Sequence, residues 1–216
     1  MDAYILENDY DAEYRYEGRP LEAVQGLDRS GRVIYIGAFT RVLFPSLRLG
    51  YVVMPAPLRD ALSRAKWVAD RHTSSLQQAA LADFMPEGHF DHYVRRFRAH
   101  SASRRVALLE AIEKNFGDGV EVLGAAAGMH VLARFPAIPA SRTAALIERA
   151  AIAGVGVYSA VPYYGAKASA CCELMLGYGA LSESEIAAAI RLLREQVADY
   201  PPFSSRFRRS RISAIS

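Results

Sequence analysis

The stretch Gly37-Ala-Phe-Thr-Arg-Val-Leu-Phe-Pro-Ser-Leu-Arg-Leu-Gly-Tyr51 joins two short apolar segments. The first segment, Val33–Ile36, ends at this stretch, and the second, Leu47–Met54, overlaps its end and stops at Pro55. Short apolar runs bounded by turn residues are typical of strands in a covered, mostly parallel sheet. The stretch is therefore predicted to be a connection between two strands.

On both sides of this stretch, the sequence predicts an α/β part that extends to about Glu87, followed by an α+β part. The long helix between them keeps apolar residues at roughly helical spacing and carries several arginines on its other face. Ser182 followed by Glu185 has the pattern of a capping box at the start of the last helix. The expected strands are Ala3–Glu7, Val120–Leu123, His130–Phe135, Val155–Tyr158 and Glu173–Leu176. The expected helices are Pro57–Asp70, Leu76–Met85, Phe90–Phe116, Ala140–Ala153 and Ser182–Ala198. Ser74 or Ser75 is expected to cap the helix Leu76–Met85.

Composition limits the class of protein. The chain has 216 residues, of which 51% are hydrophobic and 23% charged, enough for one sizeable core or two small ones. No apolar run reaches the ~18 residues of a membrane span, and no secretory signal is present, so we expect a cytoplasmic protein without membrane contact. The two cysteines, Cys171 and Cys172, are adjacent and are expected to be reduced thiols. No metal site is expected.

Several blocks of the sequence resemble one family. Glu7–Tyr16 (ENDYDAEYRY) is similar to EDDYDSEFRY, and Gly37–Tyr51 is similar to GTFSKTLFPALRLGY. Leu174–Tyr178 and Leu181–Glu185 are similar to LRLGF and LSEEE. The blocks occur in order from Glu7 to about Ala198. The chain thus resembles the C-terminal part of the aminotransferase-like domain of MocR-type transcriptional regulators, in the GntR superfamily.

This resemblance implies the fold and the domains. It implies an α/β fold, the C-terminal part of a pyridoxal-phosphate (PLP)-dependent transferase of aminotransferase class I/II. Such a part has a partial, mostly parallel sheet with helices, a long connecting helix and a small α+β domain. We expect the rest of a large cofactor-binding domain at 1–87, the connecting helix and small domain at 88–200, and a basic tail at 201–216. The chain resembles neither the regulators' DNA-binding part nor the first half of their large domain, so it is expected to be truncated and not to bind DNA alone.

The resemblance also shows four losses. Arg41 stands where the family has the Schiff-base lysine, and a guanidinium stays protonated and cannot form that bond. Asn8 replaces the acid that charges the cofactor's ring nitrogen. Ala38 replaces a hydroxyl that contacts phosphate, and Met175 replaces the arginine that holds a substrate carboxylate. We therefore expect no catalytic residues.

Other positions match the family. Tyr10 fits the tyrosine that contacts the ring oxygen, Arg48 fits a phosphate-binding arginine, and Thr40 keeps a hydroxyl. The resemblance thus implies a cofactor-binding set of Asn8, Tyr10, Thr40, Arg41 and Arg48, with PLP bound non-covalently at best. Three of them have an ordinary alternative: Asn8 can belong to a turn, and Arg41 and Arg48 can form ion pairs.

The leading hypothesis is a catalytically inactive, aminotransferase-like domain of a PLP-dependent regulator, which retains weak binding of PLP or another phosphate. Its implied partner is a small amino-acid or vitamin-like effector, and a homodimer is compatible with the family. One alternative is a working aminotransferase that a partner chain completes. Another is a nucleic-acid or protein interaction module that uses the arginine-rich helix Arg95–Arg105 and the basic tail. The three lysines Lys66, Lys114 and Lys167 are not expected to replace the missing one.

Overall fold

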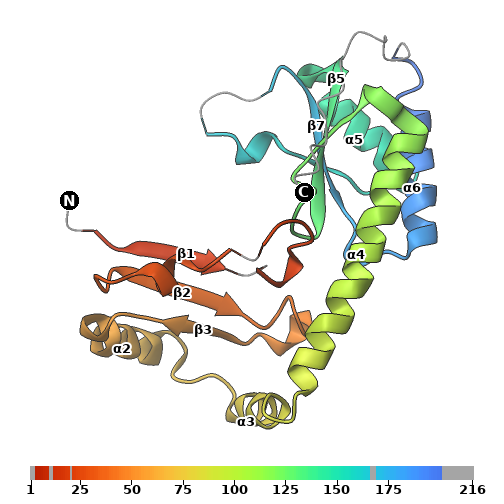
Figure 1. Ribbon diagram of the computed structural model, residues 1–216. Coiled ribbons are helices and arrows are strands. Elements are labelled where there is room, and N and C mark those ends of the chain that lie inside the picture. The colour runs from red at the N-terminus through yellow and green to blue at the C-terminus, as the bar shows by residue number, and fades with distance from the viewer. Residues whose placement is uncertain (1–2, 10–11, 20, 166–168, 201–216) are drawn as a thin grey trace. The chain divides into compact units, whose positions relative to one another are not determined.

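The structure is a computed structural model that describes residues 3–9, 12–19, 21–165 and 169–200. The chain forms two compact units, Met1–Ala99 and His100–Ser216, and the long helix α4 (His89–Phe116) has residues in both (Figure 1). The expected division between residues 87 and 88 stays a prediction. The basic tail at 201–216 lies outside the described residues.

A three-stranded sheet forms the centre of the first unit (Figure 1). Its strands are β1 (Ile5–Asp9), β2 (Val33–Ala38) and β3 (Gly50–Val53), in that order. β1 runs parallel to β2, whereas β3 runs antiparallel to it. The α/β fold class is confirmed, but this sheet is mixed rather than mostly parallel. The connection from β2 to β3 is too short for the helical crossover that parallel strands require.

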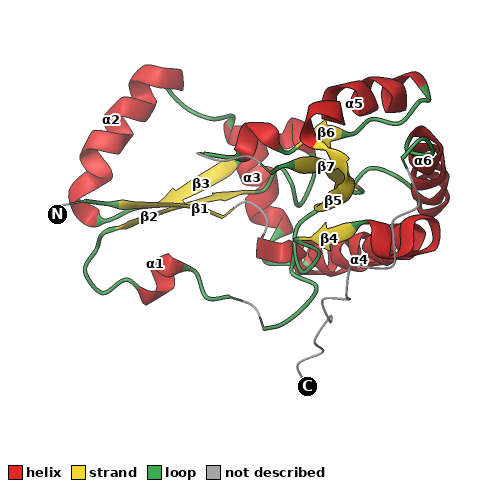
Figure 2. Ribbon diagram, turned by 90° about the horizontal axis from the view of Figure 1, so that it is seen from above, coloured by secondary structure: helices red, strands yellow, loops and turns green. Residues whose placement is uncertain are grey.

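The connection from β1 to β2 carries a short helix that the sequence did not predict. α1 (Val24–Leu27) begins where the Glu7 carboxylate accepts hydrogen bonds from the backbone N–H groups of Val24 at 2.8 Å and Gln25 at 2.9 Å. Figure 2 shows this sheet nearly edge on, with α1 on one side and α2 (Arg59–Asp70) on the other. Because Glu7 and Val24 are 17 positions apart, no local pattern indicates this helix.

The sheet of the first unit is exposed, although its apolar runs predicted a covered one. Leu6 is 65% exposed and Val52 45%, and neither α2 nor α3 (Ser75–Phe84) has a buried residue. Ser74 precedes α3 as expected, but its side chain makes no capping hydrogen bond. The buried hydrophobic residues described in this unit are Tyr14, Val33, Val42, Leu47 and Leu49. Most of this small core therefore lies near the β2–β3 connection and not over the strands.

The second unit contains a four-stranded antiparallel sheet. Across the sheet its strands are β4 (Glu121–Leu123), β5 (His130–Pro139), β7 (Cys171–Gly177) and β6 (Tyr158–Ser159). α5 (Thr143–Ile152) and α6 (Glu183–Gln196) lie beside it (Figures 1 and 2). Short 3₁₀ turns connect the elements of both units: η1 (Ala12–Tyr14), η2 (Pro45–Leu47), η3 (Ala56–Leu58), η4 (Gly117–Gly119), η5 (Ala140–Arg142) and η6 (Val161–Tyr163).

Alternation along β7 builds the core of the second unit. Cys172, Leu174 and Leu176 are at most 5% exposed, and their side chains lie on the same face of β7. The ring of Phe116, at the end of α4, meets that of Phe135 edge on, with centroids 5.5 Å apart. Both cysteines are free, as expected. None of the helices in the described residues is long and apolar enough to cross a membrane.

The start of α6 confirms the predicted capping box. Ser182 Oγ accepts a hydrogen bond from the backbone N–H of Glu185 at 3.3 Å. Glu185 Oε2 accepts one from the backbone N–H of Ser182 at 2.7 Å. Two otherwise unpaired N–H groups are thereby satisfied, which fixes where this helix begins.

Candidate ligand-binding site

Four of the predicted cofactor residues lie at one end of the three-stranded sheet. Asn8 is near the end of β1, which runs parallel to β2. Thr40 and Arg41 come just after β2, and Arg48 stands two residues before β3, whose first residue pairs with the last of β2. The fifth, Tyr10, lies outside the described residues. Ligands of open α/β sheets bind at the carboxyl ends of parallel strands, so this placement suits a ligand.

The β2–β3 loop, residues 39–49, is closed at its base by its own backbone. The N–H of Phe39 donates to the carbonyl oxygen of Leu49 at 3.0 Å. The hydroxyl of Thr40 donates to the same carbonyl over 3.5 Å, which is the long limit of a hydrogen bond. The Thr40 hydroxyl is thus held only weakly by this bond.

Two tyrosines hold the middle of this loop. The Tyr14 hydroxyl donates to the carbonyl oxygen of Arg41 at 2.7 Å, and the Tyr93 hydroxyl donates to that of Leu43 at 2.9 Å. Tyr14 is 1% exposed, and burial raises the pKa of its phenol, which therefore stays a neutral donor. Arg41 itself is exposed. Its backbone is fixed by the Tyr14 hydroxyl, and its guanidinium carries a permanent positive charge.

Arg48 has an unusual backbone. Its φ of 52° and ψ of 31° are left-handed, a conformation that a residue with a Cβ adopts at a cost of about 1 kcal/mol. The residues on either side, Leu47 and Leu49, are 8% and 5% exposed, whereas Arg48 is exposed. The turn therefore buries both leucines and leaves the guanidinium outside, at the same end of the sheet as Arg41.

The acid next to Asn8 does not replace the missing charge. Successive side chains of a strand point to opposite faces, so Asp9 lies on the other face from Asn8. There the Asp9 carboxylate accepts a hydrogen bond from the Tyr35 hydroxyl at 3.0 Å. Burial, followed by this bond, raises the pKa of Tyr35, so the phenol stays a donor.

Aromatic rings fill the Asp9 face at this end. The ring of Tyr51 lies over Gly37, and a Cβ at that glycine would be 2.4 Å from the ring. Phe39 packs on Tyr51 with centroids 5.3 Å apart. The opposite face carries Asn8 and Ala38, neither of them buried. The Asn8 face is therefore the less crowded one at this end, and the resemblance places an acid and a hydroxyl of the family at positions 8 and 38 on it.

No described lysine lies at this end of the sheet. Lys66, on α2, forms an exposed ion pair with Asp70 at 2.9 Å. Lys114 lies in the last turn of α4, in the second unit. Lys167 lies outside the described residues.

As a methionine in an apolar strand, Met175 is expected in the core, but the structure places it on the face of β7 opposite Cys172, Leu174 and Leu176. It pairs with Leu132 of β5 and Tyr158 of β6, and Leu132 also pairs with Leu123 of β4. These four form an apolar row across the sheet. Met175 and the two leucines of this row have no group that could hold a carboxylate, which the resemblance places at position 175.

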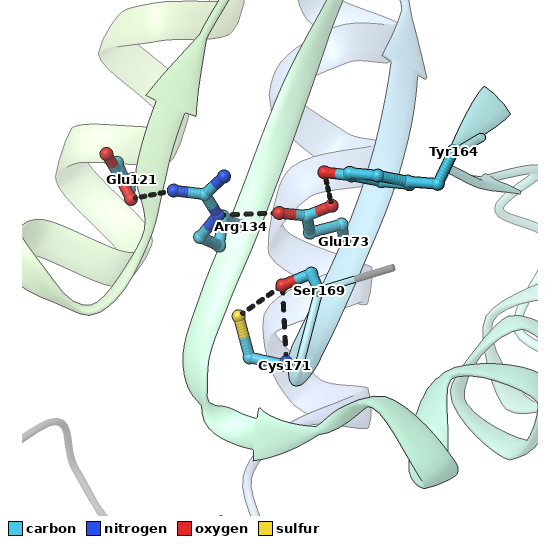
Figure 3. A network of polar contacts seen from close by, with 6 residues as sticks. All are labelled: Glu121, Arg134, Tyr164, Ser169, Cys171 and Glu173. Atoms are coloured by element: carbon cyan, nitrogen blue, oxygen red, sulfur yellow. Dashed lines mark hydrogen bonds and ion pairs between the residues drawn. The ribbon is translucent and has the colours of Figure 1, made fainter. Parts of the chain in front are cut away.

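Beside the apolar row lies a charged row that the sequence did not reveal (Figure 3). Arg134 of β5 is opposite both Glu121 and Glu173. Its Nη1 is 2.8 Å from Glu121 Oε2, and its Nε is 2.6 Å from Glu173 Oε1. The Tyr164 hydroxyl donates to Glu173 Oε2 at 2.5 Å. Strand register brings Glu121, Arg134 and Glu173 together, so no local sequence motif indicates this row.

Glu173 is ionised despite being 3% exposed. Burial acts to raise its carboxyl pKa, but hydrogen bonds from Tyr164 and Arg134 outweigh burial and leave the pKa below its usual value. The bond to Glu173 in turn raises the pKa of Tyr164. With one guanidinium between two carboxylates, the row is net negative and is no substitute for the lost carboxylate clamp.

Three arginines of α4 donate hydrogen bonds to backbone carbonyl oxygens of this chain. In the first unit, Arg98 donates to the carbonyl oxygen of Arg15. In the second, Arg104 donates to that of Gly179 at 2.7 Å, and Arg105 donates to that of Ala125. These bonds weaken the alternative in which this helix face binds nucleic acid.

The chain is similar to several known proteins. No protein-family model matches the chain. It is 38% identical over 192 residues to the uncharacterized HTH-type transcriptional regulator YhdI of Bacillus subtilis, covering 89% of this chain and 40% of YhdI. It is 46% identical over 134 residues to the probable rhizopine catabolism regulatory protein MocR of Rhizobium meliloti, covering 62% of this chain and 27% of that protein. The chain is an aminotransferase-like relative of the MocR-type regulators.

Solved enzymes share the fold of this MocR-type chain. The kynurenine aminotransferase of Pyrococcus horikoshii matches with a TM-score of 0.81 and 27% identity, covering 91% of this chain and 48% of the enzyme. The aromatic-amino-acid aminotransferase 1 of Thermococcus litoralis is 27% identical over 198 residues. The MocR-type chain spans less than half the length of the relatives named above.

Proposed function

We propose that this chain is the non-catalytic, aminotransferase-like part of a MocR-type transcriptional regulator, and that it binds PLP or another phosphate-bearing ligand without a covalent bond. The observation that carries the proposal is Arg41. It stands in the β2–β3 loop, at the position where the resemblance puts the PLP-binding lysine. As a relative of transcriptional regulators, the chain would act in the cytoplasm and respond to a small amino-acid or vitamin-like effector.

The donors at the end of the sheet suit a phosphate. Arg41 and Arg48 carry permanent positive charges, and guanidinium groups bind phosphate oxygens in pairs of hydrogen bonds. Thr40 adds a hydroxyl that only a 3.5 Å bond to Leu49 holds. With Asn8 and Tyr10 they form the proposed ligand set.

The same residues do not suit catalysis. In enzymes, PLP acts as an electron sink that stabilises a carbanion of the substrate. That chemistry requires an amine for the covalent attachment and an acid beside the ring nitrogen. Arg41 offers a guanidinium, Asn8 offers a neutral amide, and the Asp9 carboxylate is bonded to Tyr35 on the other face. This chain can therefore hold and orient such a ligand but supplies none of the proton transfers.

Equilibrium dialysis against PLP and against pyridoxal, which lacks the phosphate, tests the proposal. Binding is expected to be reversible and stronger for PLP. Arg41→Ala and Arg48→Ala are each expected to weaken it by about tenfold, the effect of losing one charge-assisted hydrogen bond. Arg95→Ala, an exposed position on α4, is the matched control. Equal binding of both ligands, or no binding, would contradict the proposal.

Borohydride reduction separates this function from the enzyme alternative. A non-covalent site leaves no reduced PLP adduct on a residue of the site. An adduct there, or transamination in the presence of a partner chain, would instead support an aminotransferase that the partner completes. Salt-dependent binding to DNA would support the interaction-module alternative.

A further inference from the structure

The apolar row of the second unit's sheet ends in an exposed aromatic ring. Its members pair one after another across β4, β5, β7 and β6: Leu123, Leu132, Met175 and Tyr158. Paired side chains of neighbouring strands lie about 5 Å apart. Tyr158 is 72% exposed, and the other three are half-buried. The apolar row is therefore a continuous strip that a ligand can reach at its Tyr158 end.

The segment that follows β6 is also apolar and exposed. Val161 is 48% exposed and Tyr163 76%. The next residue, Tyr164, reaches the face that carries the apolar row, because its hydroxyl donates to the Glu173 carboxylate there (Figure 3). Large apolar side chains that stay exposed together mark a surface that binds a ligand or a partner.

The charged row decides which ligand charge this face favours. Glu121, Arg134 and Glu173 lie on the same face as the apolar row. Each stands two positions along its strand from a member of that row, a separation of about 7 Å. The Arg134 guanidinium is engaged by both carboxylates, at 2.8 Å and 2.6 Å. The charged row is net negative, so this face attracts a cation and repels an anion.

We propose that the apolar row binds the apolar body of an organic amine that has no carboxylate, with its ammonium group toward the charged row and the Tyr158 ring. Carboxylates attract an ammonium group, and so does the face of an aromatic ring. A carboxylate on the same ligand would meet either apolar side chains or the net-negative row. A strip of four side chains suits a small molecule, since a stable protein interface takes roughly 20 residues on each side.

This inference deepens the proposed function. It rests on that proposal for the role of the effector, and it makes the effector an amine and not an amino acid. The apolar row and the charged row both lie within the second unit, whereas the proposed phosphate ligands lie in the first. Binding of an amine can therefore be measured separately from binding of PLP.

Calorimetric titration of the whole chain, without PLP, tests the proposal. The probes are phenethylamine, phenylalanine and 2-phenylethanol. Phenylalanine adds a carboxylate to phenethylamine, and 2-phenylethanol replaces its ammonium group by a neutral hydroxyl. Phenethylamine is expected to bind about tenfold more tightly than phenylalanine, because the charged row repels the carboxylate. It is expected to bind about fivefold more tightly than 2-phenylethanol, because the alcohol makes no cation–π contact.

Two substitutions locate the site. Tyr158→Ala is expected to weaken phenethylamine binding by about fivefold, the effect of losing one cation–π contact. Since Tyr158 is 72% exposed, its replacement leaves the fold intact, which circular dichroism checks. Met175→Arg adds a guanidinium to the apolar row and is expected to reverse the preference, so that phenylalanine binds more tightly than phenethylamine. Ile152→Ala, 82% exposed on α5, is the control and should leave all affinities unchanged.

Three results would overturn the proposal. They are no binding of phenethylamine, equal binding of phenylalanine and phenethylamine, and binding that neither Tyr158→Ala nor Met175→Arg changes. Dialysis against PLP measures a different quantity. A chain that binds phenethylamine without binding PLP refutes only the proposed phosphate site, and a chain that binds PLP without binding phenethylamine refutes only this inference.

Discussion

The hydroxyl of Tyr14 donates a 2.7 Å hydrogen bond to the carbonyl oxygen of Arg41, which is 27 positions further along the chain. The Tyr14 ring is buried and meets Phe97 edge on, with centroids 5.8 Å apart. The backbone at the lysine position of the family is thus supported by a rigid group of the same unit.

Tyr14→Phe is expected to lower the free energy of unfolding by about 1 kcal/mol, because it leaves the Arg41 carbonyl without this donor. Urea denaturation measures the loss. Tyr158→Phe is the control, since Tyr158 is 72% exposed and its hydroxyl should contribute within about 0.5 kcal/mol. Equal effects of the two changes would mean that the Tyr14 bond does not stabilise the loop.

Arg41→Lys is expected to give a borohydride-reducible attachment of PLP at residue 41, because it restores the amine that the family uses there. Peptide mass spectrometry after reduction locates the modified residue. Transamination should not appear, since Asn8 stays neutral.

Arg48→Lys is the matched control for this change. It also adds a lysine at the same end of the sheet, but away from the family's lysine position, and should give no adduct. If residue 41 is modified no more than the exposed Lys66, the β2–β3 loop does not present its side chain to the ligand.

Glu173→Gln is expected to destabilise the second unit by about 1–3 kcal/mol. The substitution removes the carboxylate charge that accepts hydrogen bonds from Arg134 and Tyr164. The Glu173 side chain is only 2% exposed, so the loss is large. Glu121 is the other partner of Arg134, and its side chain is 41% exposed. Glu121→Gln should therefore cost less than about 1 kcal/mol. Thermal unfolding of both variants ranks them. An equal or inverted ranking would show that the buried bond contributes no more than the exposed one.

Acid is expected to destabilise the fold through two carboxylates. Folding lowers the pKa of Glu173 below 4.5, and backbone N–H groups, that of Ser30 first, lower the pKa of Asp28 from 3.8 to about 2. A lowered folded pKa means that the stabilisation is complete above the unfolded pKa and is lost as pH falls through the folded value. Unfolding free energy should therefore fall below about pH 4.5 for Glu173 and between about pH 4 and 2 for Asp28.

Unfolding at a series of pH values checks this dependence. Glu173→Gln and Asp28→Asn should each flatten the acid side of the curve, because neither amide titrates. A variant whose stability falls with acid as steeply as the original chain would rule its residue out as a source of the pH dependence.

The sequence predicts the elements where the signal is local. Helical spacing indicates α4, and Ser182 with Glu185 indicates the start of α6. The mixed sheet was missed because the direction of β3 depends on the length of the β2–β3 loop and not on the composition of the strand. α1 was missed because Glu7 holds it from 17 positions away.

The candidate site was predictable only in part. The resemblance named the residues, and the structure places Asn8, Thr40, Arg41 and Arg48 at one end of the sheet. The resemblance could not indicate that Asp9 and Asn8 lie on opposite faces of the sheet, beside different neighbours. The row of Glu121, Arg134 and Glu173 was also missed, since its pairs are 13 and 39 positions apart and depend on register.

The β2–β3 loop is held by bonds to its carbonyl oxygens, and none of the bonds described at residues 14, 39, 40 and 93 uses the side chain of residue 41. Exchange of lysine for arginine there would leave this support intact. The conformation of this loop and the chemistry of the side chain at position 41 therefore depend on different groups, so the second can change while these four supports of the first stay in place.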